Sequence, residues 1–236
     1  MRRNRGIILG PDGNKMSKSK GNIINPDDII ARLGADTVRM YLGFMGPYGV
    51  TDNYPWDPNG VVGVRRFLER VWRLAEKISE TSNVSDDSLL HKAIKKIGED
   101  IEEYKFNTAI AQMMILVNAW EKEPSIGADE FKTFLKLLSP FAPHMTEDIW
   151  HATGESKSIH LSDWPTYDPI KLVSDTVTIA IQINGKVRAE IVVPKDLSEE
   201  SIKAEALKNP IIVSWTEKGE IKRIVYVPGR LVNIVV

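Results

Sequence analysis

The stretch GNKMSKSKGN, residues 13–22, places three lysines and two serines between glycines. Lysine ammonium groups and serine hydroxyls can bind phosphate oxygens, and flanking glycines leave backbone N–H groups accessible. The loop lacks the spacing of a P-loop, and the sequence contains no G-x-G-x-x-G motif. Such a loop could clamp a polyphosphate as negative charge builds on a leaving group. The alternative is a solvated charged turn, which is what most loops of this composition form.

Charge is unevenly distributed along the chain. Residues 1–25 hold six Lys and Arg against one Asp, whereas the 236 residues together carry a formal net charge of −1. Any nucleic-acid surface must therefore be a local patch. The chain has no cysteine, which excludes disulfides and thiolate metal sites and fits a reducing compartment, so a cytoplasmic location is expected. We expect neither a membrane segment nor a signal peptide.

The first 50 residues are predicted to form a strand, the lysine loop and two helices. The apolar stretch at 6–9 runs into a turn of Pro, Asp and Gly. Asn25 and Pro26 suit the N-cap and first position of a helix that ends near Gly34. A second helix is expected at 35–45, followed by a connection rich in turn residues that marks a domain boundary.

The middle of the chain shows the spacing of three and four between apolar positions that predicts helices. The longest is expected from Asp57 to about Thr81. Its predicted buried face comprises Val61, Val64, Leu68, Val71, Trp72, Ala75 and Ile78. Further helices are predicted at about 86–104, 107–122, 128–138 and 143–152, with caps at Ser85 and Asn107. These helices are joined by short connections and no strand is predicted between them, which favours an antiparallel bundle.

In the last part of the chain, apolar residues recur at every second position. Residues 176–183 alternate and are rich in β-branched side chains, and Asn184 with Gly185 is a strong hairpin signal. A helix from Ser198 to about Lys208 is predicted next. A shorter helix at 211–216 and strands within 221–228 and 231–236 complete a small α+β domain.

Two groups of basic residues could bind a phosphate backbone. On the long helix, the predicted basic face comprises Arg66, Arg70, Arg73 and Lys77. The alternative is a solvated face in which Glu69 pairs with Arg73.

In the last domain the basic residues are Lys186, Arg188, Lys222, Arg223 and Arg230. Lys186 and Arg188 are two apart on a strand and should share a face. The alternative is that these side chains only keep the domain soluble.

The aromatic and histidine residues are predicted to be structural. Trp72, Trp120, Trp150 and Trp215 are expected to pack, and base stacking is the less favoured role for each. His144 and His151 lie seven apart in a chain without cysteine, which makes a poor zinc site. No metal site is predicted.

The order of residues in the lysine loop is more specific than its composition. KMSKS, then KGN, then PDDII and GADTVRMYL together resemble the signature loop and following helices of class I aminoacyl-tRNA synthetases. In that family the loop binds the phosphates of ATP, with Mg²⁺, and stabilises the departing pyrophosphate. The resemblance implies catalytic roles for Lys15 and Lys18, with Lys18 the more important, and ATP contacts by Met16, Ser17 and Ser19.

The rest of the chain indicates which group of class I synthetases the sequence resembles. WDPNGVVGVRRFLERVWRL, FNTAIAQMMILVNAW and SPFAPHMTEDIW resemble the helical bundle of the leucine, isoleucine and valine enzymes. IQINGKVRAEIVVP and KRIVYVPGRLVNIVV resemble the small C-terminal domain of bacterial leucyl-tRNA synthetases. That family implies a tRNA-Leu partner, with Arg66 and Arg70 at positions that contact the tRNA body and the last domain at the tRNA elbow.

Two parts that the family needs are missing from this sequence. It has no H-I-G-H motif and no editing domain. The expectation is therefore a C-terminal piece of a leucine-tRNA ligase that is monomeric and inactive until combined with the catalytic and editing domains. The alternatives are a non-catalytic RNA-binding or assembly protein derived from such an enzyme, or the equivalent part of a valyl or isoleucyl enzyme.

The expected fold is multidomain, mainly α and then α+β. Residues 1–50 would hold the KMSKS loop and short helices. Residues 51–165 would form an antiparallel bundle of the class I anticodon-binding type, and residues 172–236 a small α+β domain with a β-hairpin.

Overall fold

A computed structural model of the chain describes residues 6–47, 53–80, 84, 88–172, 176–195, 197–216 and 221–236. The chain forms two compact units, Met1–Leu172 and Val173–Val236. The predicted boundary near residue 50 falls inside the first unit. The predicted cap at Ser85 lies outside the described residues. None of the described helices is both long and apolar enough to cross a membrane.

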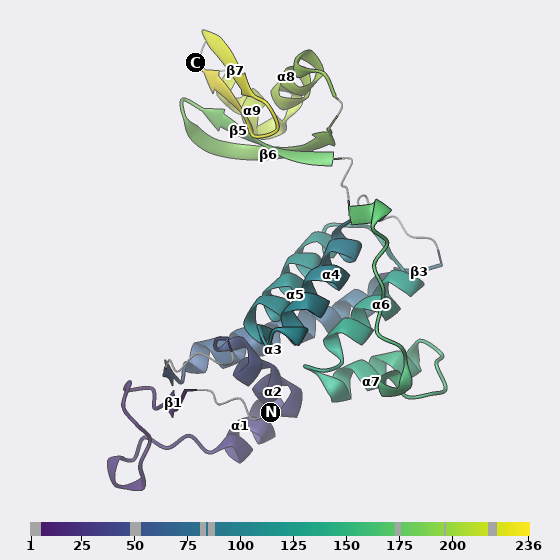
Figure 1. The fold of residues 1–236 in the computed structure, drawn as a ribbon. Coiled ribbons are helices and arrows are strands. Elements are labelled where there is room, and N and C mark those ends of the chain that lie inside the picture. The colour runs from purple at the N-terminus through teal and green to yellow at the C-terminus, as the bar shows by residue number, and fades with distance from the viewer. Residues whose placement is uncertain are drawn as a thin grey trace. The chain divides into compact units, whose positions relative to one another are not determined.

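The first unit is helical, as predicted. Its helices are α1 (Pro26–Leu33), α2 (Ala35–Phe44), α3 (Pro58–Leu74), α4 (Ser88–Glu102), α5 (Phe106–Trp120), α6 (Ala128–Leu138) and α7 (Pro143–Ala152). Short 3₁₀ turns occur at η1 (Lys18–Lys20), η2 (Ala75–Lys77), η3 (Ile159–Leu161) and η4 (Ile170–Leu172). Antiparallel α4 and α5 lie side by side, with α3 and α6 beside them (Figure 1).

Predicted caps begin two of these helices. The Asn25 side chain accepts from the N–H of Asp27 at the start of α1, at 3.2 Å. Asp57 accepts from the N–H of Asn59 in α3, at 2.9 Å, and a proline follows each cap. Helix α5 differs, because it begins at Phe106 and contains Asn107 instead of being capped by it.

Two further expectations for the bundle are wrong: the long helix does not continue to about Thr81, and a pair of short strands does lie between the helices. Helix α3 ends at Leu74 and passes through η2 into strand β3 (Ile78–Ser79), which pairs in parallel with β4 (Ile126–Gly127). Ile78 keeps the helical spacing of apolar residues, but its partner Ile126 lies 48 positions away in the sequence. The spacing of apolar residues carries no information about a pairing partner that is so distant in the sequence. The tertiary contact therefore overrides the local helical pattern.

The core of the first unit joins the residues after the lysine loop to the bundle. Met40 of α2 and Val71 of α3 are fully buried in one cluster with the aromatic side chains of α5 and α6. Strand β1 (Ile8–Leu9) pairs in parallel with β2 (Tyr54–Pro55). The loop therefore starts from a strand that is tied to the segment entering α3.

The second unit is α+β, also as predicted. Its sheet has the strand order β6-β5-β8-β7, with β5 and β8 parallel and the other neighbours antiparallel. The strands are β5 (Thr176–Ile183), β6 (Lys186–Pro194), β7 (Arg223–Val227) and β8 (Leu231–Val235). Asn184 and Gly185 both have positive φ, at 50° and 79°, which suits the predicted hairpin turn.

Two helices cover one face of this sheet. They are α8 (Glu199–Lys208) and α9 (Pro210–Thr216). Ile202 of α8 and Ile212 of α9 are buried against Ile179 and Ile181 of the central strand β5. The unit thus has a core of its own.

Candidate functional site

The base of the lysine loop is held by Asp12 and Asn22. Both carboxylate oxygens of Asp12 accept from Nδ2 of Asn22, at 3.1 and 3.2 Å, and one accepts from the N–H of Asn14 at 3.1 Å. The Asn22 side chain in turn accepts from the N–H of Ser17, at 2.9 Å, and donates to the carbonyl of Lys15, at 3.4 Å. These bonds close the loop across ten residues.

Serine and glycine shape the tip of the loop. Ser17 caps the short turn η1 by accepting from the N–H of Lys20, and its hydroxyl lies 3.2 Å from that of Ser19. Gly21 ends the turn with a φ of 62°, a left-handed conformation that favours glycine. At Gly10, a Cβ would come within 2.7 Å of the Asp12 carboxylate. A side chain at this position would therefore displace the Asp12 carboxylate that closes the loop.

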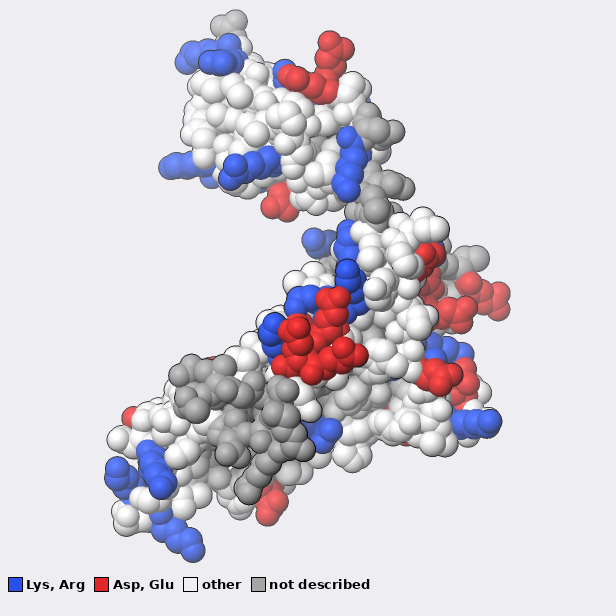
Figure 2. Space-filling view, viewed as in Figure 1, with Lys and Arg blue, Asp and Glu red and all other residues white. Residues whose placement is uncertain are grey.

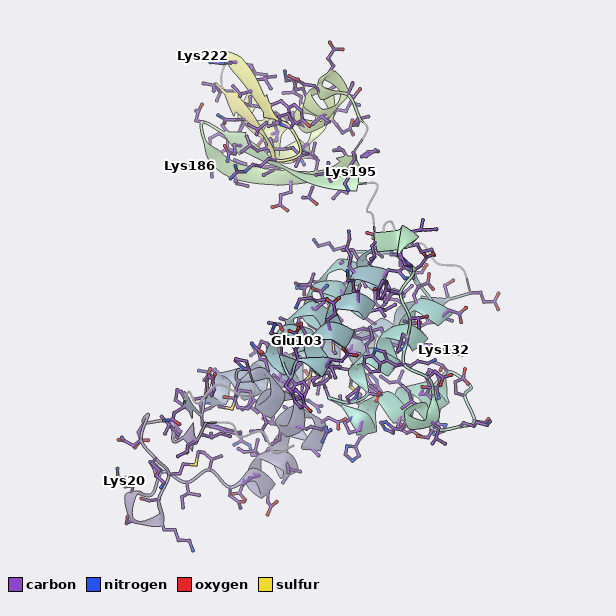
Figure 3. The ribbon with its side chains drawn as sticks, viewed as in Figure 1. Lys20, Glu103, Lys132, Lys186, Lys195 and Lys222 are labelled. Carbon is purple, nitrogen blue, oxygen red and sulfur yellow. The ribbon has the colours of Figure 1, made fainter. Side chains whose placement is uncertain are left out.

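The loop presents its lysines to solvent. Lys15, Lys18 and Lys20 are exposed, while Met16 is half-buried and packs against the core of the first unit. Lys20 lies at the end of the loop (Figure 3). Blue side chains gather at this end of the unit (Figure 2). In the described parts of the chain, none of the three ammonium groups has a hydrogen bond or ion pair, so all three are available to an anion.

Sequence reasoning did not single out Asp12 and Asn22 as site residues. The hydrogen bonds that Asp12 accepts from Asn14 and Asn22 lower the pKa of its carboxyl group. A lowered pKa in the folded state means that the ionised carboxylate stabilises the closed loop at neutral pH. That stabilisation is lost as the pH falls through the lowered pKa.

We expect the loop to open in acid, below about pH 4. The protection factor of the Ser17 amide, which compares its exchange rate measured by NMR with the intrinsic rate at the same pH, should fall there. Asp12→Ala should lower this protection factor already at pH 7, whereas Asp27→Ala, a change in α1 outside the loop, should not. A wild-type protection factor at Ser17 in Asp12→Ala would contradict this role.

The basic face of α3 is not a continuous row of free cations. Arg70 donates through Nε and Nη2 to the carboxylate of Glu121 and also to the side chain of Asn118. The ammonium group of Lys77 donates to the carbonyls of Glu121 and Glu123. The hydrogen bond from Arg70 lowers the pKa of the Glu121 carboxyl group. These two cations therefore hold the segment that follows α5.

The other two arginines of this face remain exposed. Among the described residues, Arg66 and Arg73 form no hydrogen bond or ion pair within 4.0 Å. Glu69 pairs with Arg65, at 2.8 Å, so the alternative in which Glu69 pairs with Arg73 is wrong. Arg66 and Arg73 are the members of the predicted set that can bind a phosphate from outside.

The tryptophans divide into two groups. Trp120 and Trp150 are buried, as predicted. Trp72 is 46% exposed and is not part of the buried core, so its predicted packing role is wrong, whereas Trp215 is 37% exposed but packs against the guanidinium of Arg188. In α3 the buried stripe is completed by Phe67, which leaves Trp72 at its edge.

The basic residues of the second unit are all exposed but do not form one patch. Lys186 at the start of β6 and Arg223 at the start of β7 lie at the same end of the sheet, because both strands run antiparallel to the central pair. Lys222 is next to Arg223, and Figure 3 labels Lys186 and Lys222. Arg230 precedes β8 and lies at the opposite end.

A β-bulge lies at Arg188, which was expected to point to the same face of the sheet as Lys186. The register shifts beside Ile181 and Gln182, so that Arg188 has no partner residue in β5. The alternation that would place Lys186 and Arg188 on one face is interrupted there. The guanidinium of Arg188 lies 4.6 Å from the centre of the Trp215 ring, a cation–π contact.

Comparison with known proteins places this arrangement in a family. Residues 87–204, half of the chain, match the family described as "Anticodon-binding domain of tRNA ligase". Residues 4–53, which include the lysine loop, match "tRNA synthetases class I (I, L, M and V)". The chain belongs to the class I tRNA synthetases. The arginines of α3 lie between the two matched ranges, so these matches say nothing of their role.

A solved synthetase has a similar structure. It is an Agrobacterium radiobacter LeuRS in a ternary complex with tRNA and LeuAMS, at 30% sequence identity and a TM-score of 0.65. The similarity covers 98% of this chain and 32% of the LeuRS chain. This chain therefore spans about a third of the length of that class I synthetase.

Proposed function

We propose that this class I synthetase chain acts as the C-terminal part of a bacterial-type leucyl-tRNA synthetase, a cytoplasmic enzyme that activates leucine with ATP and transfers it to tRNA-Leu. The observation that carries the proposal is that the ammonium groups of Lys15 and Lys18 are exposed and, within the described residues, unpaired, on a loop closed by Asp12 and Asn22. The similarity to a LeuRS supports the choice of leucine.

In this proposal Lys15 and Lys18 contact the phosphates of ATP. When the carboxylate of the amino acid attacks the α-phosphate, negative charge grows on the departing pyrophosphate. Ammonium groups positioned for that charge lower the barrier, because they bind the transition state more strongly than the ground state. Ser17 and Met16 fix the path of the loop through the η1 cap and the core contact.

The loop does not fit a role in holding Mg²⁺. Its one carboxylate, that of Asp12, is occupied by hydrogen bonds from Asn14 and Asn22. The chain's part is therefore limited to the lysine contacts, and the H-I-G-H catalytic region and the editing domain must be supplied by other parts of the enzyme. We expect the isolated chain to show no ATP–pyrophosphate exchange.

Transfer RNA is the partner proposed for the bundle and the second unit. Two exposed arginines of α3, Arg66 and Arg73, and the basic residues of the second unit can contact phosphates. Such contacts position an RNA without reading its sequence. A non-catalytic RNA-binding protein is the second candidate. The uncommitted lysines weigh against it, because RNA binding by the bundle does not require them.

Charge reversal at Arg66 and Arg73 tests the proposed tRNA interface. The double variant Arg66→Glu, Arg73→Glu should weaken tRNA binding and lower the slope of log affinity against log salt by about one per lost phosphate contact. Titrations with leucine and valine tRNAs at two salt concentrations measure both effects, and a chain ending at Leu172 reports the share of the second unit.

The matched control uses an arginine that is already engaged. Exchanging Arg70 and Glu121, as Arg70→Glu with Glu121→Arg, preserves their ion pair and should leave tRNA affinity within about threefold. Equal affinity of the wild type and the Arg66, Arg73 double variant would contradict the proposed interface.

A further inference from the structure

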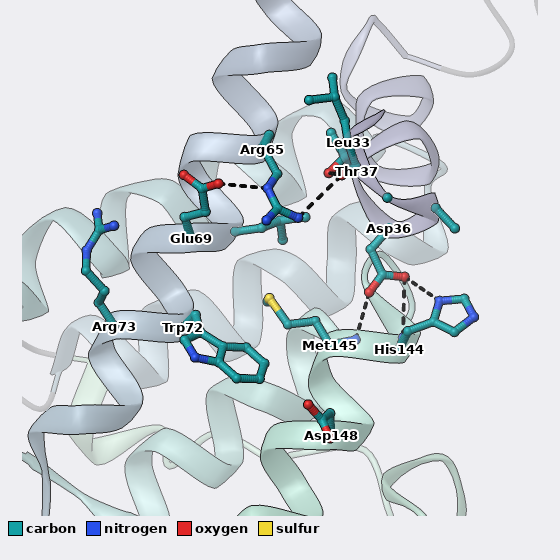
Figure 4. Close-up of a pocket in the computed structure, with 13 residues that line it drawn as sticks. Leu33, Asp36, Thr37, Arg65, Glu69, Trp72, Arg73, His144, Met145 and Asp148 are labelled. Carbon is teal, nitrogen blue, oxygen red and sulfur yellow. Dashed lines mark hydrogen bonds and ion pairs between the residues drawn. The ribbon is translucent and has the colours of Figure 1, made fainter. Parts of the chain in front are cut away.

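A cavity of about 770 Å³ opens beside the exposed arginines of the first unit. Its walls are the α1–α2 corner, one side of α3 and the first turn of α7 (Figure 4). Leu68 is buried in it and Leu33 and Met145 are half-buried, so much of its lining is apolar. Trp72 stands in the wall that α3 contributes, and 46% of this residue is exposed.

Several polar groups around this cavity are already engaged with one another. The buried carboxylate of Asp36 accepts from the N–H groups of His144 and Met145, at 3.3 and 2.7 Å, and lies 2.7 Å from Nδ1 of His144. It thereby caps the N-terminus of α7, so those amides are not available to a phosphate. Arg65 is likewise engaged, by Glu69 and by the carbonyl of Leu33.

Three lining groups are left for a ligand. The face of Trp72 offers an aromatic surface toward α7, and Arg73, the next residue of α3, offers a cation whose side chain extends away from that ring (Figure 4). The exposed carboxylate of Asp148 stands on α7, across the cavity from α3 (Figure 4). Neither Arg73 nor Asp148 has a hydrogen bond or an ion pair within the described part of the chain, although Arg73 interacts electrostatically with the Glu121 carboxylate and Asp148 with His151.

We propose that this cavity binds one unpaired nucleotide of an RNA, with its base stacked on Trp72, its phosphate on Arg73 and its amino edge toward Asp148. Every base has a face that stacks on an aromatic ring, and a guanidinium binds phosphate through paired donors. A carboxylate only accepts hydrogen bonds, so it favours bases that carry an exocyclic amine over uracil. This inference rests on the proposed tRNA-binding function and adds a site to it.

The observations favour RNA over a protein segment in this cavity. Arg73 belongs to the pair of uncommitted arginines of α3, so a backbone that follows this helix places a phosphate next to Trp72. The free groups are one flat ring, one cation and one acceptor, which matches the parts of a single nucleotide. A protein segment would leave the adjacent cation and the carboxylate without a defined partner.

Titrations of tRNA-Leu with four forms of the full chain test the proposal, at two salt concentrations. Trp72→Leu should weaken binding on the order of 10- to 100-fold, the usual range for loss of a stacked base, with an unchanged salt slope. Trp72→Phe should retain most of the affinity because phenylalanine still stacks. Trp164→Leu is the control, since Trp164 is similarly exposed, at 42%, but lies outside the cavity.

The base preference is tested with six-nucleotide oligomers. Oligo(A) should bind more tightly than oligo(U), and Asp148→Leu should abolish that difference while leaving oligo(U) binding unchanged. Equal binding of the two oligomers to the wild-type chain would overturn the role of Asp148.

The outcomes separate this inference from the proposed function. If the wild-type chain binds tRNA and Trp72→Leu binds as well, the stacking site is wrong and a protein segment becomes the occupant to seek. Equal losses in Trp72→Phe and Trp72→Leu would also overturn stacking. Failure of the wild-type chain to bind any tRNA would overturn both the proposed function and this site.

Discussion

Replacing Lys18 by alanine is expected to slow ATP–pyrophosphate exchange by about 10²- to 10³-fold when the chain acts with its catalytic region. Among the residues that the structure describes, the ammonium group is exposed and unpaired, on a loop whose backbone is held by other residues. Its removal should therefore take away charge stabilisation in the transition state without unfolding the loop. The loss should appear in kcat and in kcat/KM for ATP alike, because the contact strengthens as charge develops.

Lys20 provides the matched control for this prediction. It lies in the same turn, is equally exposed and carries the same charge, but the family resemblance gives it no role. Lys20→Ala should stay within a few-fold of the wild type. Similar losses in Lys18→Ala and Lys20→Ala would indicate a diffuse electrostatic effect and contradict a specific contact between Lys18 and the phosphates. An unchanged rate in Lys18→Ala would contradict the proposed phosphate contact altogether.

Replacing Phe134 by alanine should lower the free energy of unfolding of the first unit by about 3 to 5 kcal/mol. The Phe134 side chain is fully buried, and its ring packs edge-on against Trp120, with centroids 5.6 Å apart, and beside Phe131. A cavity at this point would remove contacts from both α5 and α6. Urea unfolding followed by near-UV circular dichroism measures the loss.

Ile115 is the control for the core prediction. It lies on α5 but is 53% exposed, so Ile115→Ala should change stability by no more than about 0.5 kcal/mol. A loss of less than about 1.5 kcal/mol in Phe134→Ala would mean that the core of the bundle collapses around the missing ring.

Local signals determined most of the elements of this fold. Caps at Asn25, Asp57 and Ser198 act within two or three residues, and the sequence placed the helices that follow them. Helices α6 and α7 have the predicted bounds. The hairpin at Asn184 and Gly185 was likewise predictable, because its turn demands residues that adopt positive φ.

Other features depend on residues far apart in the sequence, and local patterns missed them. Strand β3 exists because Ile78 meets Ile126. The exposure of Trp72 depends on which side chains of α3 the bundle covers. The spacing of apolar residues alone had wrongly predicted that Trp72 lies on the buried face. Arg70 has the same spacing as Arg66, yet tertiary packing brings Glu121 to it across 51 positions.

By itself the sequence determined the helical and α+β character of the two units, the position of the lysine loop and the family, because these follow from short-range order along the chain. Only the tertiary structure decided which cations are free. Within the described residues, it left the loop lysines, Arg66 and Arg73 unpaired, engaged Arg70 and Lys77, and turned Trp72 toward a cavity. The physical reason is that ion pairs and burial are set by neighbours in space, which the order of residues does not specify.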